Sequence, residues 1–429
     1  MDRAAPPHSA RRFWYAVPAM AVCAATPALA QDYGDPSGKS LIATADVRLV
    51  AVDGERSWID GGFGKTRFGP DGAAPLDHLK LEPRAIVGDV VWQPQISWSL
   101  GATLAVTAQA GQEHPIDLSE AYLSWLRGPR GALKLSGRLG AFWPPVSLEH
   151  SGPNWAVTET ITPSAINSWI SEEVKVGGAE ATASLPVGQQ GRVYATIALF
   201  GFNDTAGTLL AFRGWALSDE KATLFGHQVL PPLNGLMRYV QAPATKPMIE
   251  LDNRPGYYVR LGWMPDPAIR LHAFHYDNRG DPHAVSSQLQ WGWRTRVTEI
   301  GGTAAFGATR ITAQAMAGRT EMGFPMPDRI WVDTRFRSAF ALVTRTIGKG
   351  SVSGRIEAFG TRANGSVLGA DESEDGGAVT RAARRSFGAH VTVLAEALHV
   401  ETDREARVRS GLDPHQNQTV LQLAMRLHS

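Results

Sequence analysis

Hydrophobic and polar residues alternate over long stretches of this chain. In segment 41–52, hydrophobic residues at every second position alternate with Thr44, Asp46 and Arg48. Successive side chains of a β-strand point to opposite faces, so this period predicts a strand with one apolar and one polar face. Segment 96–110 keeps the same period over about 15 residues, longer than the roughly 5–6 residues of a typical strand.

The two-residue period recurs along the chain, while the 3.6-residue period of helices is scarce. Short turns such as 265–267 and 348–351 separate many of the segments, and strands joined so tightly must run antiparallel. The further predicted strands are 131–142, 192–200, 257–264, 269–276, 288–297, 310–316, 335–345, 352–361, 391–399 and 419–428. The connections 143–172, 203–256, 365–384 and 401–418 are long, which predicts one elaborate and one smooth end.

The first 30 residues have the features of an export signal. Arg3, Arg11 and Arg12 precede an apolar run that ends in Ala28-Leu29-Ala30, so we expect cleavage after residue 30. The mature chain is then 31–429, which has 399 residues. The only cysteine of the whole sequence, Cys23, is removed with the signal. Disulfides, thiol nucleophiles and thiolate metal sites are therefore excluded for the mature chain.

Charge and hydropathy exclude two further classes. The whole chain has a formal charge of +1, and residues 31–429 have −1 because the signal holds three arginines and one aspartate. This balance does not suit a nucleic-acid-binding protein. No mature stretch approaches the roughly 18–20 uninterrupted apolar residues of a membrane-spanning helix. No composition break or linker divides the chain, which indicates one large unit.

Long alternating strands in an exported chain favour a transmembrane β-barrel over a secreted β-sandwich. A membrane-spanning strand needs about 9–11 residues with its apolar side toward lipid, and such strands must close into a barrel without edges. We therefore predict an all-β, antiparallel transmembrane barrel of about 16 strands, with 14 and 18 as alternatives, long loops on one side and a short loop helix. Aromatic residues expected at the membrane interfaces are Trp92, Trp98, Trp125, Trp143, Tyr257, Trp263, Trp291 and Trp293.

In these features the chain resembles the outer-membrane porin superfamily of Gram-negative bacteria, loosely the general and phosphate-selective porins. The last strand is amphipathic, with outward Leu421, Leu423, Met425 and Leu427, although Ser429 stands where that family has an aromatic residue. The resemblance implies an outer-membrane channel for passive diffusion of small hydrophilic solutes, and a homotrimer without cofactors. It also implies contact with outer-membrane lipid and lipopolysaccharide.

If the apolar side faces lipid, the opposite side places many basic residues in the channel. The inward acids, Asp46, Glu120, Glu180, Glu357 and Glu396, are fewer. An excess of positive charge concentrates anions, which predicts a mild anion preference, and the alternative is that these bases are structural partners of carboxylates. The predicted pore-lining or solute-binding residues are Arg48, Lys134, Arg138, Arg192, Arg260, Arg270, Arg294, Arg296, Arg310, Arg355 and Arg426.

Segment 143–172 contains the one credible helix, with Thr162 as a plausible N-cap, Pro163 in the first turn and an apolar face beyond. By resemblance we assign this segment as a constriction loop that folds into the barrel, and an extracellular cap is the alternative. Its charged candidates, expected to face Arg138 or Arg192, are Glu149, His150, Glu159, Glu172 and Glu173. Segment 203–256 is expected to be a long extracellular loop, as a lid or a trimer contact.

No catalytic motif or metal-binding pattern is evident in the sequence, so we expect neither a catalytic nor a metal site and predict that the protein is not an enzyme. Two alternatives remain. An outer-membrane hydrolase would need a serine and a histidine together on the outward side, near one rim of the barrel. A secreted β-rich binding protein would lack the barrel altogether.

Overall fold

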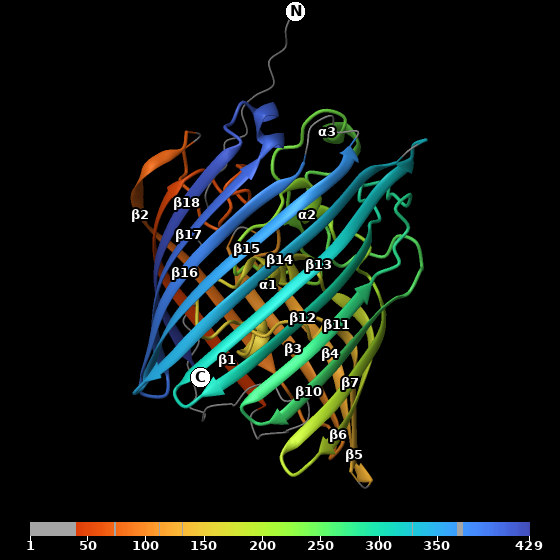
Figure 1. The fold of residues 1–429 in the computed structure, drawn as a ribbon, viewed down its shortest axis with the longest axis vertical. Coiled ribbons are helices and arrows are strands. Elements are labelled where there is room, and N and C mark those ends of the chain that lie inside the picture. Colours follow the sequence, from red (N-terminus) through yellow and green to blue (C-terminus); the bar gives the residue numbers. More distant parts are fainter. Residues whose placement is uncertain (1–39, 73, 111, 131, 328, 367–371) are drawn as a thin grey trace, which may run out of the picture.

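The computed structural model describes residues 40–429 except 73, 111, 131, 328 and 367–371. Sixteen antiparallel strands form one closed barrel, which confirms the predicted fold class and strand number (Figure 1). The predicted signal, 1–30, lies outside the described residues. No helix of the described residues is long and apolar enough to cross a membrane.

The barrel strands follow one another as a meander, and the remaining elements lie in the connections. The strands are β1 (Leu41–Gly54), β2 (Leu76–Trp92), β3 (Leu100–Gln109), β4 (Ile116–Arg130), β5 (Leu133–Phe142), β6 (Val176–Val187), β7 (Gly191–Gly201), β10 (Gly256–Asp266), β11 (Ile269–Asp277), β12 (Arg294–Phe306), β13 (Thr309–Pro325), β14 (Ile330–Ile347), β15 (Gly350–Ser366), β16 (Glu374–Phe387), β17 (Val391–Arg404) and β18 (His415–His428). The other elements are α1 (Ala165–Glu173), α2 (Thr208–Phe212), α3 (Met237–Val240), the two-residue strands β8 (Gln228–Val229) and β9 (Ala244–Thr245), and the 3-10 helices η1 (Pro153–Trp155) and η2 (Glu405–Ser410).

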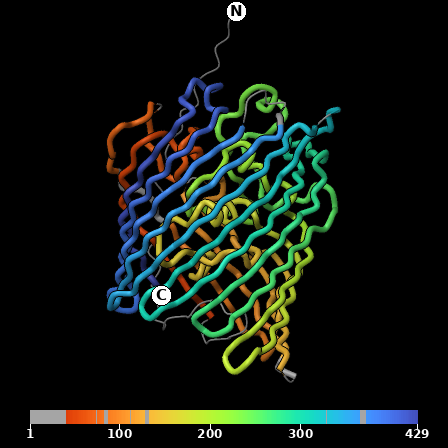
Figure 2. The backbone as a smooth tube through the Cα atoms, viewed as in Figure 1, coloured from red at the N-terminus to blue at the C-terminus, as the bar shows by residue number. Residues whose placement is uncertain are grey.

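The first and last strands close the barrel. β1 pairs with β18 in antiparallel register, with Leu49 opposite Leu423, and the two strands run side by side in Figure 2. The terminal Ser429 extends this seam, because its backbone N–H donates to the Ala43 carbonyl at 2.9 Å and its hydroxyl accepts from the Ala43 N–H at 2.9 Å. Backbone pairing thus continues to the end of the chain, although the aromatic terminal residue of the porin pattern is absent.

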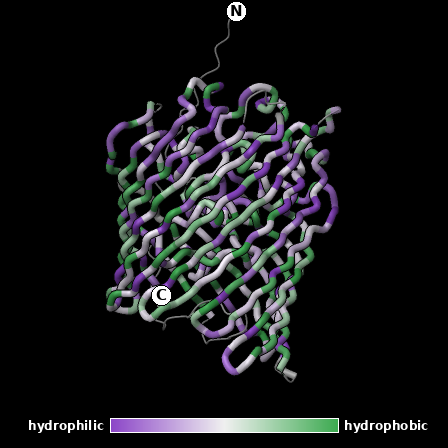
Figure 3. The backbone as a smooth tube through the Cα atoms, viewed as in Figure 1, coloured by the Kyte–Doolittle hydropathy of each residue, from purple (hydrophilic) through white to green (hydrophobic). Residues whose placement is uncertain are grey.

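Side chains alternate between the two sides of the barrel, as the two-residue period predicts. Hydrophilic and hydrophobic positions follow one another closely along the barrel strands (Figure 3). Large apolar residues such as Leu199, Ile300 and Ile356 are 62%, 59% and 65% exposed and point outward. Thr103 and Thr107 of β3 lie on the inward side and are buried. An apolar outer surface on a closed barrel is what a bilayer requires.

Short and long connections alternate between the two ends of the barrel. At one end, turns such as 267–268, 307–308 and 348–349 join neighbouring strands, and we call this the short-turn end. The opposite long-loop end carries 143–175 and 202–255. The expected long connection 365–384 is wrong, because most of it belongs to β16, whose many polar and small residues concealed the strand period.

Two predicted strands are misplaced. β3 begins at Leu100, so residues 96–99 belong to the preceding turn. β12 begins at Arg294, six residues after the start of the predicted strand 288–297. Both errors arose because apolar loop residues continued the alternation beyond the end of a strand.

Seven of the eight aromatic residues predicted at the interfaces divide into two groups, and the eighth, Tyr257, is half-buried. Trp92, Trp98, Trp125 and Trp263 are 40–80% exposed, as expected at a membrane interface. In contrast, Trp143, Trp291 and Trp293 are at most 4% exposed and are buried among other side chains, so their interfacial placement is wrong. This barrel has an apolar core as well as an apolar exterior.

Candidate functional site

The loop between β5 and β6 turns into the barrel and carries α1 inside it (Figure 1). The predicted helix is present, but it begins at Ala165, after Ser164 rather than Thr162 as its N-cap. The Ser164 hydroxyl accepts a hydrogen bond from the Asn167 N–H at 3.4 Å. All residues from 160 to 176 are buried, so α1 has no water-exposed face.

Arg355 of β15 holds the loop just before α1. Its guanidinium pairs with Glu149 at 2.9 Å and with Glu357 at 3.0 Å. It also donates to the carbonyls of Thr162 at 2.9 Å and Pro163 at 3.0 Å. Arg355 is only 1% exposed, and these acceptors satisfy the charge that burial would otherwise penalise.

Carboxylates from the barrel wall hold the backbone of the same segment. Glu357 accepts from the Ala165 N–H at 2.7 Å, and Glu396 accepts from the Thr162 N–H at 3.0 Å. The first N–H groups of a helix lack partners within the helix and carry partial positive charge, so negative groups are stabilising there. The wall therefore provides a specific seat for the start of α1.

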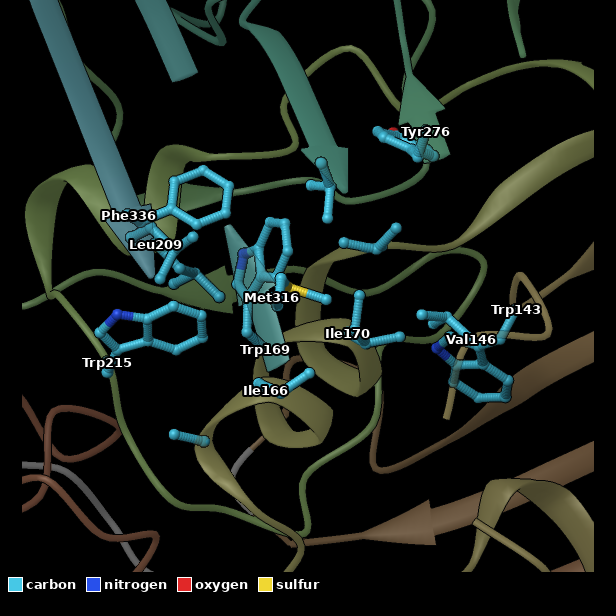
Figure 4. Close-up of a cluster of buried hydrophobic side chains, with 14 of the residues drawn as sticks. Trp143, Val146, Ile166, Trp169, Ile170, Leu209, Trp215, Tyr276, Met316 and Phe336 are labelled. Atoms are coloured by element: carbon cyan, nitrogen blue, oxygen red, sulfur yellow. The ribbon is translucent and has the colours of Figure 1, made fainter. Parts of the chain in front are cut away.

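The apolar face of α1 packs against the wall and against a second inward segment (Figure 4). Trp169 lies 5.3 Å from the Phe336 ring of β14 and 6.2 Å from the Trp215 ring, measured between centroids. Ile166 and Ile170 are buried in the same cluster. The inward side of the barrel is thus partly apolar, because it contacts α1 rather than water.

The other side of the loop is fixed by Arg138 of β5. Arg138 pairs with Glu180 at 2.9 Å and donates to the Trp143 carbonyl at 2.9 Å. The Trp143 indole N–H in turn donates to the Ser171 carbonyl near the end of α1, at 3.2 Å. Both ends of the helix are therefore connected to the wall.

A second segment, 203–224, also lies inside, although the whole of 203–256 was expected outside. All residues from 203 to 211 are buried, and α2 contacts α1. The Leu209 N–H donates to Glu173 at 3.0 Å, and Arg213 pairs with Glu172 at 2.6 Å. We call residues 143–175 and 203–224 together the lumenal plug.

Acidic groups of the lumenal plug are displaced from their ordinary pKa values. Burial raises the pKa of Glu173 to about 7, although the N–H groups of Leu209 and Trp169 favour its ionised form. Burial raises the pKa of Glu220 to about 7 against the opposing charge of Arg67. Burial therefore favours the protonated form of both carboxyl groups.

Four of the predicted pore-lining bases face inward and have carboxylate partners. Besides Arg138 and Arg355, Arg48 pairs with Asp219 at 2.7 Å and Arg426 pairs with Asp46 at 2.7 Å. These contacts favour the alternative in which such bases are structural partners of acids.

Five other predicted bases lie on the inward side of their strands, four of them near the short-turn end and Arg260 in the middle of β10, and no ion pair to a carboxylate is found for them among the described residues. Arg270 and Arg310 are exposed, and Arg260 is half-buried, 5.2 Å from the Tyr194 ring and 3.3 Å from His272 Nδ1. We call these five residues the basic vestibule. They are Lys134, Arg192, Arg260, Arg270 and Arg310.

Arg294 and Arg296 correct the prediction, because they point outward. On β12 the buried, inward side carries Thr295, Val297 and Glu299, so the arginines lie on the opposite side. Outside the barrel, Arg296 pairs with Glu321 at 3.1 Å. The apolar residues preceding them, taken as lipid-facing, contact the interior instead, which inverted the assignment.

The five charged candidates of the loop do not face Arg138 or Arg192 as ion-pair partners. Glu149 pairs with Arg355 and Glu172 with Arg213, while Glu159 accepts from the Ser351 hydroxyl at 2.7 Å. The Trp169 indole N–H donates to Glu173 at 2.6 Å, and His150 stacks on Trp155 at 4.8 Å. Burial and the nearby Lys221 charge hold the pKa of His150 well below its usual value.

Strand parity could not identify the loop bases that hold the plug. Lys65, Arg67, Arg213 and Lys221 lie in connections, where strand parity does not apply. Lys221 pairs with Asp89 at 2.9 Å, and Arg67 pairs with Asp219 at 3.0 Å. In segment 203–224, the mixture of Arg213 and Lys221 with apolar residues was the available hint that this segment is buried.

Among the described residues, one cluster of three carboxylates has the spacing of a metal site. Asp204, Glu250 and Asp252 place one oxygen each within 4.8 Å of one another. Burial and the neighbouring acids raise the pKa of Asp204 to about 7. These carboxylates also accept backbone N–H groups, with Asp204 accepting from Leu251 at 2.5 Å, so the cluster has a structural role without an ion.

Solved structures of several outer-membrane proteins have a barrel similar to this one. The outer membrane channel DcaP of Acinetobacter baumannii is similar with a TM-score of 0.53 and 10% identity, over 90% of this chain and 96% of that one. The anion-selective porin from Comamonas acidovorans is similar with a TM-score of 0.50 and 9% identity, over 91% and 98%. A loop L8 deletion mutant of OmpT, an outer membrane protein of Vibrio cholerae, gives 0.50 and 10%, over 91% and 100%.

The barrel has the fold of outer-membrane porins. No protein-family model and no curated protein matches the sequence. Within this porin fold, the lumenal plug fills the middle of the barrel and the basic vestibule lies toward the short-turn end.

Proposed function

We propose that this protein is an outer-membrane channel through which small hydrophilic solutes diffuse passively, with a preference for anions. The observation that carries the proposal is the basic vestibule, which places five basic residues on the inward side of a closed 16-strand barrel without carboxylate partners among the described residues. Barrels of this size enclose a channel. Uncompensated positive charge within low-dielectric walls concentrates anions and favours their passage.

The lumenal plug is proposed as the constriction. Because residues 160–176 are buried on all sides, no solute path contacts α1 in the described arrangement. Conduction at this level then depends on movement of the plug from its seat on Arg355 and the wall carboxylates. We therefore expect small conductance at rest and larger conductance when the seat is weakened.

The expected location is the outer membrane of a Gram-negative bacterium, reached through the predicted signal 1–30. The apolar outer surface supports contact with membrane lipid, and the porin resemblance supports a homotrimer. Recovery of the protein in the soluble periplasm would contradict this location. Sedimentation of the purified protein in detergent tests the trimer.

Liposome swelling tests the channel. Purified protein in liposomes is expected to accelerate swelling in small sugars, amino acids and small organic anions, but not in large oligosaccharides. Trp169→Ala, which removes apolar packing of α1, is expected to increase the rate. Swelling no faster than in protein-free liposomes, with the wild type and with this variant, would overturn the proposal.

A hydrolase is the second candidate, because one outward histidine contacts both a hydroxyl and a carboxylate. His399 Nδ1 lies 3.0 Å from the Thr419 hydroxyl, and His399 Nε2 lies 3.1 Å from Glu401. A threonine stands where the hydrolase hypothesis expects a serine. The contacts of His399 with Thr419 and Glu401 are equally consistent with a structural hydrogen-bond chain on the outer wall. Hydrolysis of short-chain esters that disappears in Thr419→Val would support the hydrolase, and no hydrolysis by the wild type would exclude it for this substrate class.

A further inference from the structure

A cavity of about 60 Å³ lies at the long-loop end, where the β1–β2 loop, the segments around α2 and α3 and the end of β17 meet. Its lining includes Phe63, Lys65, Phe212, Arg213, Met237, Arg404 and the carboxylate residue Glu372, and we call it the mouth pocket. This volume is several times the roughly 10–15 Å³ that a cavity needs to hold one water molecule, so a carboxylate group fits. None of the predicted pore-lining residues belongs to it.

Two buried guanidinium groups line the mouth pocket and are incompletely satisfied. Arg213 and Arg404 are each 4% exposed, and among the described residues the buried Nη1 nitrogen of each has no hydrogen-bond partner. Their Nη2 nitrogens are used, Arg213 with Glu172 at 2.6 Å and Arg404 with Glu372 at 2.6 Å. A buried donor without an acceptor is destabilising, more so when it is charged, so a bound acceptor would be stabilising.

Three cations meet at this place, and each has one carboxylate partner: Lys65 pairs with Glu374, Arg213 with Glu172 and Arg404 with Glu372. Lys65 donates to the carbonyls of Arg213 at 2.9 Å and Trp215 at 3.1 Å, and it pairs with Glu374. Burial lowers the pKa of Lys65 to about 8, and the Arg404 charge acts in the same direction against Glu374. An anionic ligand would therefore bind through the donors that these carboxylates leave unused, rather than through an excess of positive charge.

The other side of the mouth pocket is apolar. Met237 is 1% exposed, and Phe63 and Phe212 are half-buried. Phe212 is itself held edge to face against Trp293, with 5.9 Å between ring centroids. A pocket with convergent guanidinium groups and an apolar wall suits a ligand with an anionic end and an apolar body.

We propose that the mouth pocket binds small organic anions that carry a carboxylate on an aromatic or alkyl body, before they enter the barrel. The carboxylate would accept from Arg213 and Arg404, and the apolar body would lie against Phe63 and Met237. This inference rests on the proposed channel function and names a substrate class for it. Arg213 also contacts Glu172 of α1, so the ligand would bind beside the lumenal plug.

Calorimetric titration of the purified full-length protein in detergent tests the site. Benzoate is the probe, benzamide is its neutral counterpart, and inorganic phosphate is an anion without an apolar body. We expect benzoate to bind at least about tenfold more tightly than either. Equal binding of benzoate and benzamide would overturn the role of the arginines, and equal binding of phosphate would overturn the role of the apolar wall.

Variants locate the site. Phe63→Ala and Arg404→Gln are each expected to weaken benzoate binding about tenfold, and Phe63→Ala keeps the test valid if Arg404→Gln does not fold. Arg337→Gln, an outward residue whose side chain is 74% exposed, is the matched control and is expected to bind as the wild type does. Unchanged binding in Phe63→Ala and in folded Arg404→Gln would overturn the proposal.

The titration does not depend on conduction, so the two proposals fail separately. Absence of benzoate binding together with liposome swelling would overturn the mouth pocket alone. Benzoate binding without swelling by the wild type or by Trp169→Ala would overturn the channel, and with it the assignment of benzoate-like anions as transported substrates.

Discussion

Inward basic residues occur in two regions of this barrel, and their surroundings differ. In the middle, around the lumenal plug, Arg138 and Arg355 are at most 4% exposed and pair with Glu180 and Glu357 at 2.9 and 3.0 Å. In the basic vestibule, Arg270 and Arg310 are exposed and have no carboxylate partner among the described residues. The same residue type on the same side of the wall therefore has two roles.

Hydration explains the difference. A charge removed from water is stable only with a well-placed opposite charge, so the bases beside the plug are ion-paired with acids. A base that water solvates needs no such partner, and its field acts on mobile ions instead. Strand parity determines which way a side chain points, whereas burial determines whether its charge is available to a solute.

The largest expected effect is the removal of a paired base. Arg355→Met leaves Glu149 and Glu357 buried without their cation, which we expect to lower the free energy of unfolding by about 4 kcal/mol. Arg310→Met in the basic vestibule is the matched control, expected to change it by less than about 0.5 kcal/mol. Denaturant unfolding of both variants in detergent makes the measurement, and equal losses would remove the distinction between the two regions.

Apolar packing of the plug should have the next effect. Trp169→Ala removes the contacts with Phe336 and Trp215, at an expected cost of about 3 kcal/mol. Single-channel recording is expected to show larger or more frequent openings, because α1 leaves its seat more readily. Trp98→Ala, at an 80% exposed position, is the control, and a conductance of Trp169→Ala identical to it would contradict the proposed constriction.

These two regions also mark how far the sequence predicts the structure. The alternation predicted the barrel, the length of the mature chain predicted about 16 strands, and strand parity placed Arg48, Arg138, Arg355 and Arg426 on the inward side. It failed at Arg294, because the interior is apolar where it contacts the plug and hydrophobicity no longer marks the lipid side. The two-residue period also cannot predict which residues that are distant in the sequence form ion pairs.

Loop residues provide the clearest example of such pairing. Arg213 and Lys221 come from a segment without strand or helix period, yet they pair with Glu172 and Asp89, which lie 41 and 132 residues away. Only the folded barrel brings these groups together. A large set of candidate bases could thus be predicted, but their division into paired and free groups could not.

A smaller effect is expected from pH. The pKa of Glu173 is raised from 4.5 to about 7, so above pH 4.5 the carboxyl ionises more easily in the released plug than in the seated one. Stability of the seat is therefore lost as pH rises from about 4.5 to 7, and conductance should increase over that window. Glu173→Gln is expected to flatten this dependence, with a remainder from Glu220, whose pKa is also about 7. Conductance that falls as pH rises would contradict the assignment.

The most direct test of the account is the reversal potential of the channel in a planar bilayer under a salt gradient. The wild type is expected to give an anion-selective sign. Replacement of Lys134, Arg192, Arg260, Arg270 and Arg310 by glutamine is expected to shift the potential toward cation selectivity, with little change in unfolding free energy. A cation-selective wild type, or a potential that these five replacements leave unchanged, would contradict the role of the basic vestibule.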